Sequence, residues 1–343
     1  MNKIGFYPGT AWHAYQKLLA EALEKGGYEV VQGDDFSDKA LCKTDQTILH
    51  FHWIERLWDG PSYLGRIKCL IGVWGYLRKA KRLNKTIVWT VHNHEPHQAP
   101  SVLDKIGVRM FCWYADVIAC HSHWSKNWIM KASVNTVSPI VVYHGNFKGV
   151  FHGVEDNRSL KQREGLAINK LCVGMIGEIR PNRGHELAIR LVNQLDDVQL
   201  LIAGRIKDTI YLDALIKMVA QDKRQNVIFK VGNLSDQEYN DYSACSDVCL
   251  LPYHSITTSG ALMSAWTIGT PVIASDLDYF KEMIPSVSQT DAIFSLNDED
   301  NLLEIVCSYK QRNWLKLRQD TLMKAASYDW DIVVQPMLKH LKK

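Results

Sequence analysis

The stretch that decides the fold is LPYHSITTSGALMSAWTIGTPVIASD, which spans Leu251–Asp276. An apolar run that ends in Leu-Pro-Tyr is followed by a hydroxyl-rich loop, a helix that starts near Gly260, and a second apolar run. A strand, a loop, a helix and a second strand in this order are typical of parallel α/β layers. Ligands of such layers bind at the carboxyl ends of strands, so we expect Ser259 and Gly260 to lie at a ligand-binding edge.

The same alternation extends along the chain in both directions. We expect strands at 2–7, 47–53, 85–92, 116–122 and 139–145, and again at 170–177, 198–204, 226–232, 247–253 and 270–276. Helices are expected between them, for example at 184–195, 235–244 and 259–268. The 235–244 helix opens with Ser235 and Glu238 at the spacing of a capping box.

Two α/β sets predict two Rossmann-like parallel-sheet domains that face each other across a cleft. We place the first domain at 1–148 and the second at 165–327, with the polar segment 145–169 as the crossing. The amphipathic C-terminal helix, at about 328–343, is expected to pack back on the first domain.

Bulk composition fits a globular protein of this size. The chain has 343 residues, of which 46% are hydrophobic and 22% are charged. No segment reaches the ~18 apolar residues of a membrane span, and the first residues lack the apolar run of a signal peptide. The eight cysteines have no metal-type spacing, so we expect reduced thiols and a cytoplasmic protein. A net charge of +3 is too small to indicate a nucleic-acid partner.

Charge is distributed unevenly between the two parts. Residues 1–150 contain 18 Lys and Arg against 12 Asp and Glu, and they contain nine of the 13 histidines. The rest of the chain carries a small negative net charge. The two predicted domains therefore have different tasks.

A diphosphate clamp is predicted after the strand at 170–177. The sequence GMIGEIRPNRGHELAI places Arg180 and Arg183 in a loop directly before Gly184, which opens a helix. Helix N-termini and guanidinium groups both bind phosphate oxygens. The alternative is a surface loop with ordinary arginines.

The hydroxyl-rich loop offers a second phosphate site. Thr257, Thr258 and Ser259 supply hydroxyls, and Gly260 lets a phosphate approach the backbone closely. A plain N-capped helix is the alternative, because Ser and Thr are common caps. The chain has neither GxGxxG after its first strand nor a Walker motif, and no Asp-x-Asp pair at a strand end, so we expect no obligatory metal.

Histidines follow two strands of the first half. His50, His52, Trp53 and Glu55 end one strand, and His92, Asn93, His94 and His97 end another. These residues suit acid–base chemistry and hydroxyl recognition. A zinc site and unrelated loop histidines are the alternatives, although compact metal-ligand spacing is missing.

The segment 63–85 predicts a helix that is apolar and aromatic on one side and basic at its end. A solvated helix end is one interpretation. Contact with a membrane surface or a pyrophosphate lipid is the other.

With these motifs in view, the chain resembles the GT-B glycosyltransferases, and among them the GDP-mannose:glycolipid β-mannosyltransferases of bacterial exopolysaccharide assembly. The resemblance rests on motifs in the same order over nearly the whole chain. They are His50, His52, Trp53 and Glu55; Thr90, His92, Asn93, Pro96 and His97; His144 and Gly145; Ile179, Arg180, Pro181 and Gly184; and Leu251, Pro252, Tyr253, Ser259 and Gly260. The chain departs from the family at Ile54, Gln98 and Arg183.

The resemblance implies an inverting, nucleotide-sugar-dependent transferase. An inverting enzyme needs one base and a stabilised leaving group, so the absence of a carboxylate from 256–264 is expected. The implied base is Glu55 or His92. The implied donor-binding residues are Arg180, Arg183, Gly184, Tyr253, Thr258, Ser259 and Gly260, and the acceptor-binding residues are His52, Trp53, Asn93 and His97.

We therefore expect a hexosyltransferase that moves mannose from GDP-mannose to a lipid-linked oligosaccharide. It would use no cofactor, no metal and no nucleic acid, and would act peripherally at the inner face of the plasma membrane. A transferase that uses a UDP-sugar and a catalytically silent GT-B binding protein are the alternatives.

Overall fold

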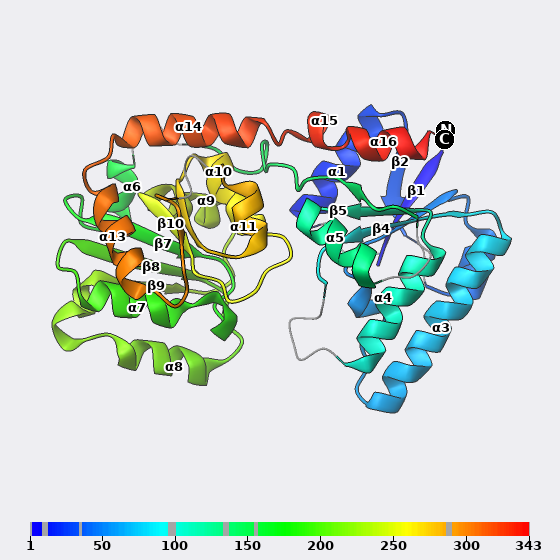
Figure 1. Ribbon diagram of the computed structural model, residues 1–343, viewed down its shortest axis with the longest axis horizontal. Helices are drawn as coiled ribbons and strands as arrows, with labels where there is room; N and C mark the ends of the chain where they lie inside the picture. Colours follow the sequence, from blue (N-terminus) through cyan, green and yellow to red (C-terminus); the bar gives the residue numbers. More distant parts are fainter. Residues whose placement is uncertain are drawn as a thin grey trace. The chain divides into compact units, whose positions relative to one another are not determined.

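The computed structural model describes residues 2–8, 13–33, 36–94, 101–132, 137–153, 157–285 and 290–342 (Figure 1). The chain divides into two compact units. Unit 1 comprises Met1–Gly145 and Trp330–Lys343, and unit 2 comprises Asn146–Asp329. Within the described residues, no helix is long and apolar enough to cross a membrane.

Unit 1 is built on a six-stranded parallel sheet in the order β2-β1-β3-β4-β5-β6. Its strands are β1 (Lys3–Tyr7), β2 (Glu29–Gln32), β3 (Ile48–Phe51), β4 (Thr86–Val91), β5 (Val117–Cys120) and β6 (Ile140–Val141). Its helices are α1 (Ala14–Lys25), α2 (Asp38–Lys43), the short 3-10 helix η1 (Ile54–Trp58), α3 (Tyr63–Arg82), α4 (Val102–Tyr114), α5 (His123–Ala132), α15 (Trp330–Val333) and α16 (Gln335–Leu341). The inner strands are buried on both faces, which is why most of their residues are apolar.

Unit 2 repeats this plan with the order β12-β11-β10-β7-β8-β9. Its strands are β7 (Leu171–Ile176), β8 (Val198–Gly204), β9 (Val227–Val231), β10 (Val248–Leu251), β11 (Val272–Ser275) and β12 (Ile293–Phe294). Its helices are α6 (Arg158–Arg163), η2 (Pro181–Arg183), α7 (His185–Asn193), α8 (Thr209–Met218), η3 (Gln221–Asn226), α9 (Asp236–Cys245), α10 (Gly260–Ile268), α11 (Asp278–Met283), α13 (Glu299–Tyr309) and α14 (Trp314–Ala326). All of its strand pairs are parallel as well.

The ten strands expected from sequence are confirmed, and two further strands were missed. These are β2 and β12, which form the outer edges of the two sheets. An edge strand packs against fewer neighbours and can be short or polar, so its sequence carries a weak signal. β2 has only Val30 and Val31 as apolar residues, and β12 is two residues long.

The C-terminal segment, which was expected to form one helix at about 328–343, is interrupted. The chain forms α15 and then α16, which has a proline in its first turn. Pro336 has no backbone N–H to donate to a preceding turn, so it suits the start of a new helix. Both helices belong to unit 1, where α15 lies against α1 and α16 lies against β5 and β6.

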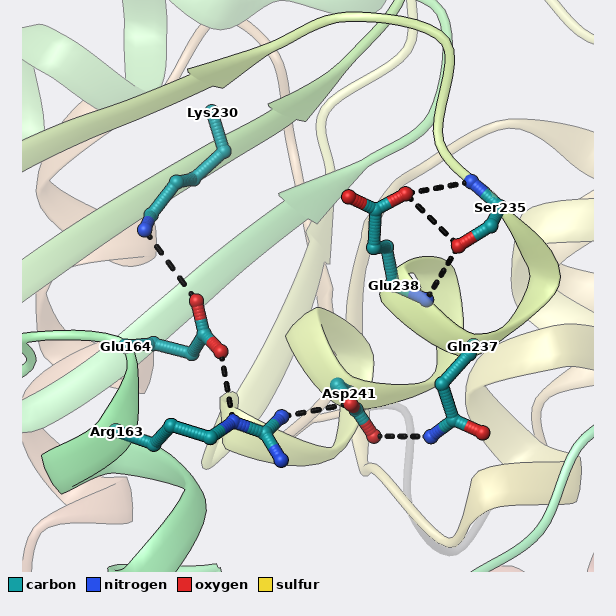
Figure 2. Close-up of polar contacts among 7 residues, drawn as sticks. All are labelled: Arg163, Glu164, Lys230, Ser235, Gln237, Glu238 and Asp241. Carbon is teal, nitrogen blue, oxygen red and sulfur yellow. Dashed lines mark hydrogen bonds and ion pairs between the residues drawn. The ribbon is translucent and has the colours of Figure 1, made fainter.

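The segment expected to cross between the domains is largely part of unit 2. Residues 146–169 include α6, and polar contacts hold the end of this helix to α9 and β9 (Figure 2). Arg163 donates to Asp241, and Lys230 pairs with Glu164 at 3.3 Å. The capping box of α9 is confirmed, because the Ser235 backbone N–H donates to Glu238 at 2.8 Å and the Glu238 N–H donates back to the Ser235 hydroxyl.

A core of buried histidines distinguishes unit 1. Tyr15 contacts the rings of His52, His92, His121 and His144, and the ring of His50 lies against that of His52. All five histidines are at most 5% exposed. His50 lies on β3 and His52 follows the strand, and their rings lie on the same side, as alternation along extended chain predicts, with ring centroids 4.3 Å apart. Burial lowers the pKa of all five: that of His121 to about 4, those of His50 and His144 to about 3, and those of the other two well below 6.5.

These neutral histidines make unit 1 sensitive to acid. Each folded-state pKa lies below the unfolded value near 6.5, so below that pH the unfolded chain binds more protons than the folded one. As the pH is lowered from 6.5 to about 4, we expect the unfolding free energy to fall by about 1.4 kcal/mol per pH unit for each of these histidines. Urea unfolding at a series of pH values, with hydrogen exchange in β3 and β4, measures this slope.

A matched variant isolates one member of the core. The Nδ1 of His121 donates to the Val142 carbonyl at 2.7 Å, and the amide of asparagine reproduces this donor without titrating. His121→Asn should therefore unfold with a shallower pH dependence than the parent protein. An unchanged slope would mean that this histidine does not remain neutral in the folded state.

Candidate functional site

The loop after β7 carries the predicted diphosphate clamp. It runs through Arg180 and η2 to Gly184, which precedes α7. The Ile179 backbone N–H donates to the Arg205 carbonyl at 2.8 Å, so this loop is held beside the loop that follows β8. Arg180, in the loop after β7, and Arg205, in the loop after β8, therefore lie at the same edge of the sheet.

Gly184 is required by the close approach of two loops. Its φ of 72° lies in the left-handed region, and an added Cβ would lie 2.2 Å from the Pro252 carbonyl oxygen. The His254 backbone N–H also donates to the Asn182 carbonyl at 3.1 Å. The start of α7 is thereby fixed against the loop that follows β10.

Arg180 and Arg183 are both partly buried and lie close enough to repel each other. The guanidinium of Arg183 lies over the Tyr253 ring, 4.1 Å from its centroid. Burial, followed by the charge of Arg183, lowers the pKa of Arg180. In the described part of the chain, neither arginine Nε has a hydrogen-bond partner, although both atoms are buried. Such donors are costly to leave unsatisfied, and they fit an anionic ligand.

Glu178 was not predicted, yet it organises the cations around this loop. Its carboxylate lies 3.7 Å from Arg180, 3.3 Å from Arg205 and 3.5 Å from Lys207. Burial alone would raise the pKa of Glu178, but these three positive charges hold it below its usual value. Its position directly after the β7 strand and two residues before Arg180 was the available sequence signal.

The hydroxyl-rich loop ends in a capped helix, as the plainer interpretation predicts. The Ser259 hydroxyl accepts from the Leu262 N–H at 3.1 Å, and this side chain is 2% exposed. Thr258 lies near Tyr279. Burial raises the pKa of Tyr279 to about 12, and the Thr258 hydroxyl partly offsets this rise. An added Cβ at Gly260 would contact only the Phe147 ring, at 3.9 Å, so the space above this residue is open.

The two donor-side motifs are brought to neighbouring strand ends. β7 and β10 pair directly, and Tyr253 after β10 contacts Arg183 after β7. Among the described residues, no hydrogen bond or ion pair joins Thr258, Ser259 or Gly260 to the two arginines. A cavity at this edge, lined by Glu178, Arg183 and Tyr253, has room for about one water, with a volume of about 10 Å³.

In unit 1, Glu55 lies on η1, directly after β3. Trp53, which precedes this helix, has a φ of 39°, an uncommon value for a bulky residue and one found at functional sites. The Asn93 amide donates to the Glu55 carboxylate at 2.8 Å. Burial raises the pKa of Glu55, while the hydrogen bond from Asn93 lowers it in part. The half-buried carboxylate therefore suits a general base.

The pKa of His92 does not lie near neutrality, which makes His92 a weaker candidate for the base than Glu55. Its Nε2 lies 3.0 Å from His52 Nδ1, and its ring stacks on Trp53 with centroids 4.3 Å apart. Burial and the neighbouring histidines lower its pKa well below 6.5. His52 is fully buried behind it. His97 and its neighbours Pro96 and Gln98 lie outside the described residues.

The zinc alternative was tested against the same histidines. Over the described ranges, no group of three or more His, Cys, Asp or Glu side chains is arranged to hold a metal ion. Several ring nitrogens in the core instead form hydrogen bonds within the protein, whereas His52 Nε2 and His121 Nε2 have no partner among the described residues. His50 Nε2 lies 2.7 Å from the Thr90 hydroxyl, and His144 Nδ1 donates to the Gly145 carbonyl at 2.7 Å. All eight cysteines are free thiols.

Comparisons with known proteins show which families the chain is similar to. Residues 170–310 match the family described as glycosyl transferases group 1. The chain is 24% identical over 272 residues to a GDP-mannose:glycolipid 4-beta-D-mannosyltransferase from Xanthomonas campestris pv. campestris, with 78% of this chain and 71% of the relative covered.

Solved structures show the fold. The crystal structure of Anabaena Alr3699/HepE in complex with UDP and glucose superposes with a TM-score of 0.77 at 15% identity, and covers all of both chains. That of WaaG, a glycosyltransferase involved in lipopolysaccharide biosynthesis, gives 0.63 at 14% identity, over 99% of this chain and 98% of the other. The chain therefore has the GT-B glycosyltransferase fold, and residues 170–310, which carry the arginine and serine motifs, match the group 1 glycosyltransferase family.

Proposed function

We propose that the protein is an inverting, metal-independent hexosyltransferase that moves mannose from GDP-mannose to a lipid-linked oligosaccharide in polysaccharide biosynthesis. The observation that carries the proposal is the partly buried pair Arg180 and Arg183, whose Nε donors have no partner in the described protein. Two adjacent positive charges with unused donors suit a nucleoside diphosphate.

The donor side is assigned to unit 2. Arg180 and Arg183 neutralise the diphosphate, and the N–H groups at the start of α7, beside Gly184, face the same edge of the sheet. The Tyr253 ring packs against the Arg183 guanidinium and holds it in place. Thr258, Ser259 and Gly260 present the N-terminus of α10 to the donor as a second set of N–H groups.

The acceptor side is assigned to unit 1, with Glu55 as the base. The acceptor oxygen forms a bond to the anomeric carbon while its proton passes to Glu55, and the bond from that carbon to the diphosphate oxygen breaks. The nucleoside diphosphate departs with the electron pair, and the arginines stabilise its charge without a metal ion. One displacement of this kind inverts the anomeric centre.

We assign Trp53 and Asn93, which lie beside this base, to the acceptor. Trp53 is partly exposed and can contact a sugar ring through its indole, and Asn93 holds Glu55 in place. His52 supports His92 from within the core, and His92 in turn supports Trp53 by stacking. We also assign His97 to the acceptor.

The sugar and the acceptor are proposed from similarity. The Xanthomonas relative is described as using GDP-mannose and a glycolipid, which supports this donor and a lipid-linked acceptor. A lipid-linked acceptor supports a location in the cytoplasm, peripheral to the plasma membrane. A UDP-sugar donor is the competing choice, and nucleotide binding distinguishes the two.

Nucleotide binding tests the arginine clamp. GDP or GDP-mannose at about 100 times its dissociation constant should stabilise the protein by roughly 2.7 kcal/mol in a thermal-shift measurement. Arg183→Ala should weaken this binding about 10- to 100-fold in calorimetry, because a charged hydrogen bond contributes about 1.5–3 kcal/mol.

Arg190→Ala is the matched control. Arg190 lies on α7, the helix that follows the arginine loop, but it is exposed and pairs with Glu299, so its removal should leave the nucleotide shift intact. A shift with UDP and UDP-glucose alone would replace the GDP-mannose assignment. No shift with any nucleotide would contradict the transferase proposal and favour a silent binding protein.

Glu55→Gln tests the base. Turnover should fall about 10²- to 10⁴-fold, since general-base catalysis contributes about this much, while nucleotide affinity stays unchanged. His92→Gln keeps a neutral polar side chain and should reduce turnover less, because a neutral, buried His92 is not the base. Full turnover by folded Glu55→Gln would rule out the assignment.

Asn93→Ala gives a pH signature that a purely structural role would not. The Asn93 amide stabilises the charged form of Glu55, so its loss should raise the pKa of this carboxyl further. Activity requires ionised Glu55, and the acid limb of kcat/KM should therefore move to higher pH in the variant. A lower plateau with an unmoved limb would mean that Asn93 only shapes the loop.

A further inference from the structure

Two neighbouring helices of unit 1 expose an apolar surface that catalysis does not use. We define the α3–α4 face as Leu64, Lys68, Ile71, Trp74 and Arg78 of α3 with Val102, Ile106, Arg109 and Trp113 of α4. The residues on each helix recur at helical spacing and so share one side of it. Leu64 is 77% exposed, Trp113 is 66% and Ile71 is 61%.

The two helices lie side by side (Figure 1). Their side chains line a groove between them. The groove has a volume of about 490 Å³ and is lined mainly by apolar atoms of Ile71, Trp74, Ile106, Met110 and Trp113. Single exposed apolar residues are ordinary on protein surfaces, but a contiguous patch with a hollow between aromatic side chains marks an interaction site.

The exposed charged residues of these two helices are all positive. α3 carries Arg66, Lys68, Arg78, Lys79, Lys81 and Arg82 and has no acidic residue. The one acidic residue of α4, Asp104, is buried and is held by Arg66 and by the Trp58 indole. Lys68 and Arg109 form no ion pair within the described part of the chain. Positive charges that flank an apolar groove complement an anionic surface.

We infer that the α3–α4 face docks on the surface of an anionic phospholipid bilayer, with Trp74 and Trp113 at the level of the headgroups. Tryptophan is enriched at membrane–water interfaces because its ring is apolar and its N–H is polar. The long basic side chains reach the phosphates while their stems cover apolar surface. The inference rests on the proposed function in one respect: docking on a bilayer would bring the protein to its lipid-linked acceptor.

The contact lies along the helices rather than at the basic end of α3. Lys81 pairs with Asp116, and the Lys85 amino group donates to the carbonyls of Thr44 and Gln46. These cations hold unit 1 together, so the helix end is less available to a membrane than the sequence alone suggests. The apolar groove, in contrast, has no covering segment among the described residues.

Vesicle co-sedimentation tests the inference without any activity measurement. The full chain should bind phosphatidylcholine vesicles that contain about 30% phosphatidylglycerol, bind less at high salt, and bind pure phosphatidylcholine weakly. The double variant Lys68→Gln/Arg109→Gln should lose about 25-fold in affinity, since one surface cation contributes about fivefold. The double variant Ile71→Glu/Trp113→Glu should abolish binding.

Two exposed residues of unit 2 supply matched controls. Ile210→Glu changes an isoleucine of α8 that is 80% exposed, and Lys217→Gln removes an exposed cation from the same helix. Both controls should bind vesicles as the parent protein does. Thermal unfolding and the nucleotide shift should remain unchanged in every variant, which shows that a loss of vesicle binding is not a loss of fold.

Three outcomes would overturn the inference. The first is a parent protein that does not bind anionic vesicles, and the second is binding that survives the Ile71→Glu/Trp113→Glu change. The third is concentration-dependent dimerisation in ultracentrifugation that this variant removes, since a second copy would then cover the face. Failure of nucleotide binding would sink the proposed function instead and would leave vesicle binding as a separate result.

Discussion

Both candidate sites depend on the parallel pairing of strands. In a parallel sheet every strand ends at the same edge, so residues that follow different strands meet there although they are far apart in the chain. β3 and β4 pair with His50 opposite Val88, which brings the residues after each strand together and lets Asn93 reach Glu55. β10 pairs with β7 in parallel as well, which brings the Tyr253 ring into contact with the Arg183 guanidinium.

Each site contains an ionisable group whose charged form is disfavoured by burial. Arg180 and Arg183 repel each other in a partly buried loop, and a diphosphate would relieve this repulsion. Glu55 is buried enough to raise its pKa, and accepting a proton from the acceptor would relieve its desolvation. The buried histidines of unit 1 differ from these groups, because burial keeps their rings neutral, and most of them form a hydrogen bond within the protein. This contrast separates residues that act on a ligand from residues that support them.

Unit 1 also links the proposed base to the proposed membrane surface through a few contacts. η1, which carries Glu55, packs on both α3 and α4. Its Trp58 indole donates to Asp104 at the start of α4, and the same carboxylate accepts from Arg66 of α3. An added Cβ at Gly107 would lie 2.5 Å from the Trp58 ring, so α4 has a glycine where η1 approaches. A bilayer docked on the two helices would thus hold its lipid-linked acceptor on the same unit as the proposed base.

The sequence by itself determined the strand order along the chain, the α/β class and the motifs that follow the strands. Those features depend on local periodicity, caps and glycines, which a chain reveals without its fold, as Ser235, Ser259 and Gly184 illustrate. It could not reveal the edge strands, the break before Pro336, or the roles of Glu178 and Tyr15, because each depends on partners that only packing supplies. The choice between Glu55 and His92 is of the same kind. Their unperturbed pKa values favour histidine as the base, and only tertiary burial, which raises the pKa of the carboxyl and lowers that of the imidazole, reverses this preference.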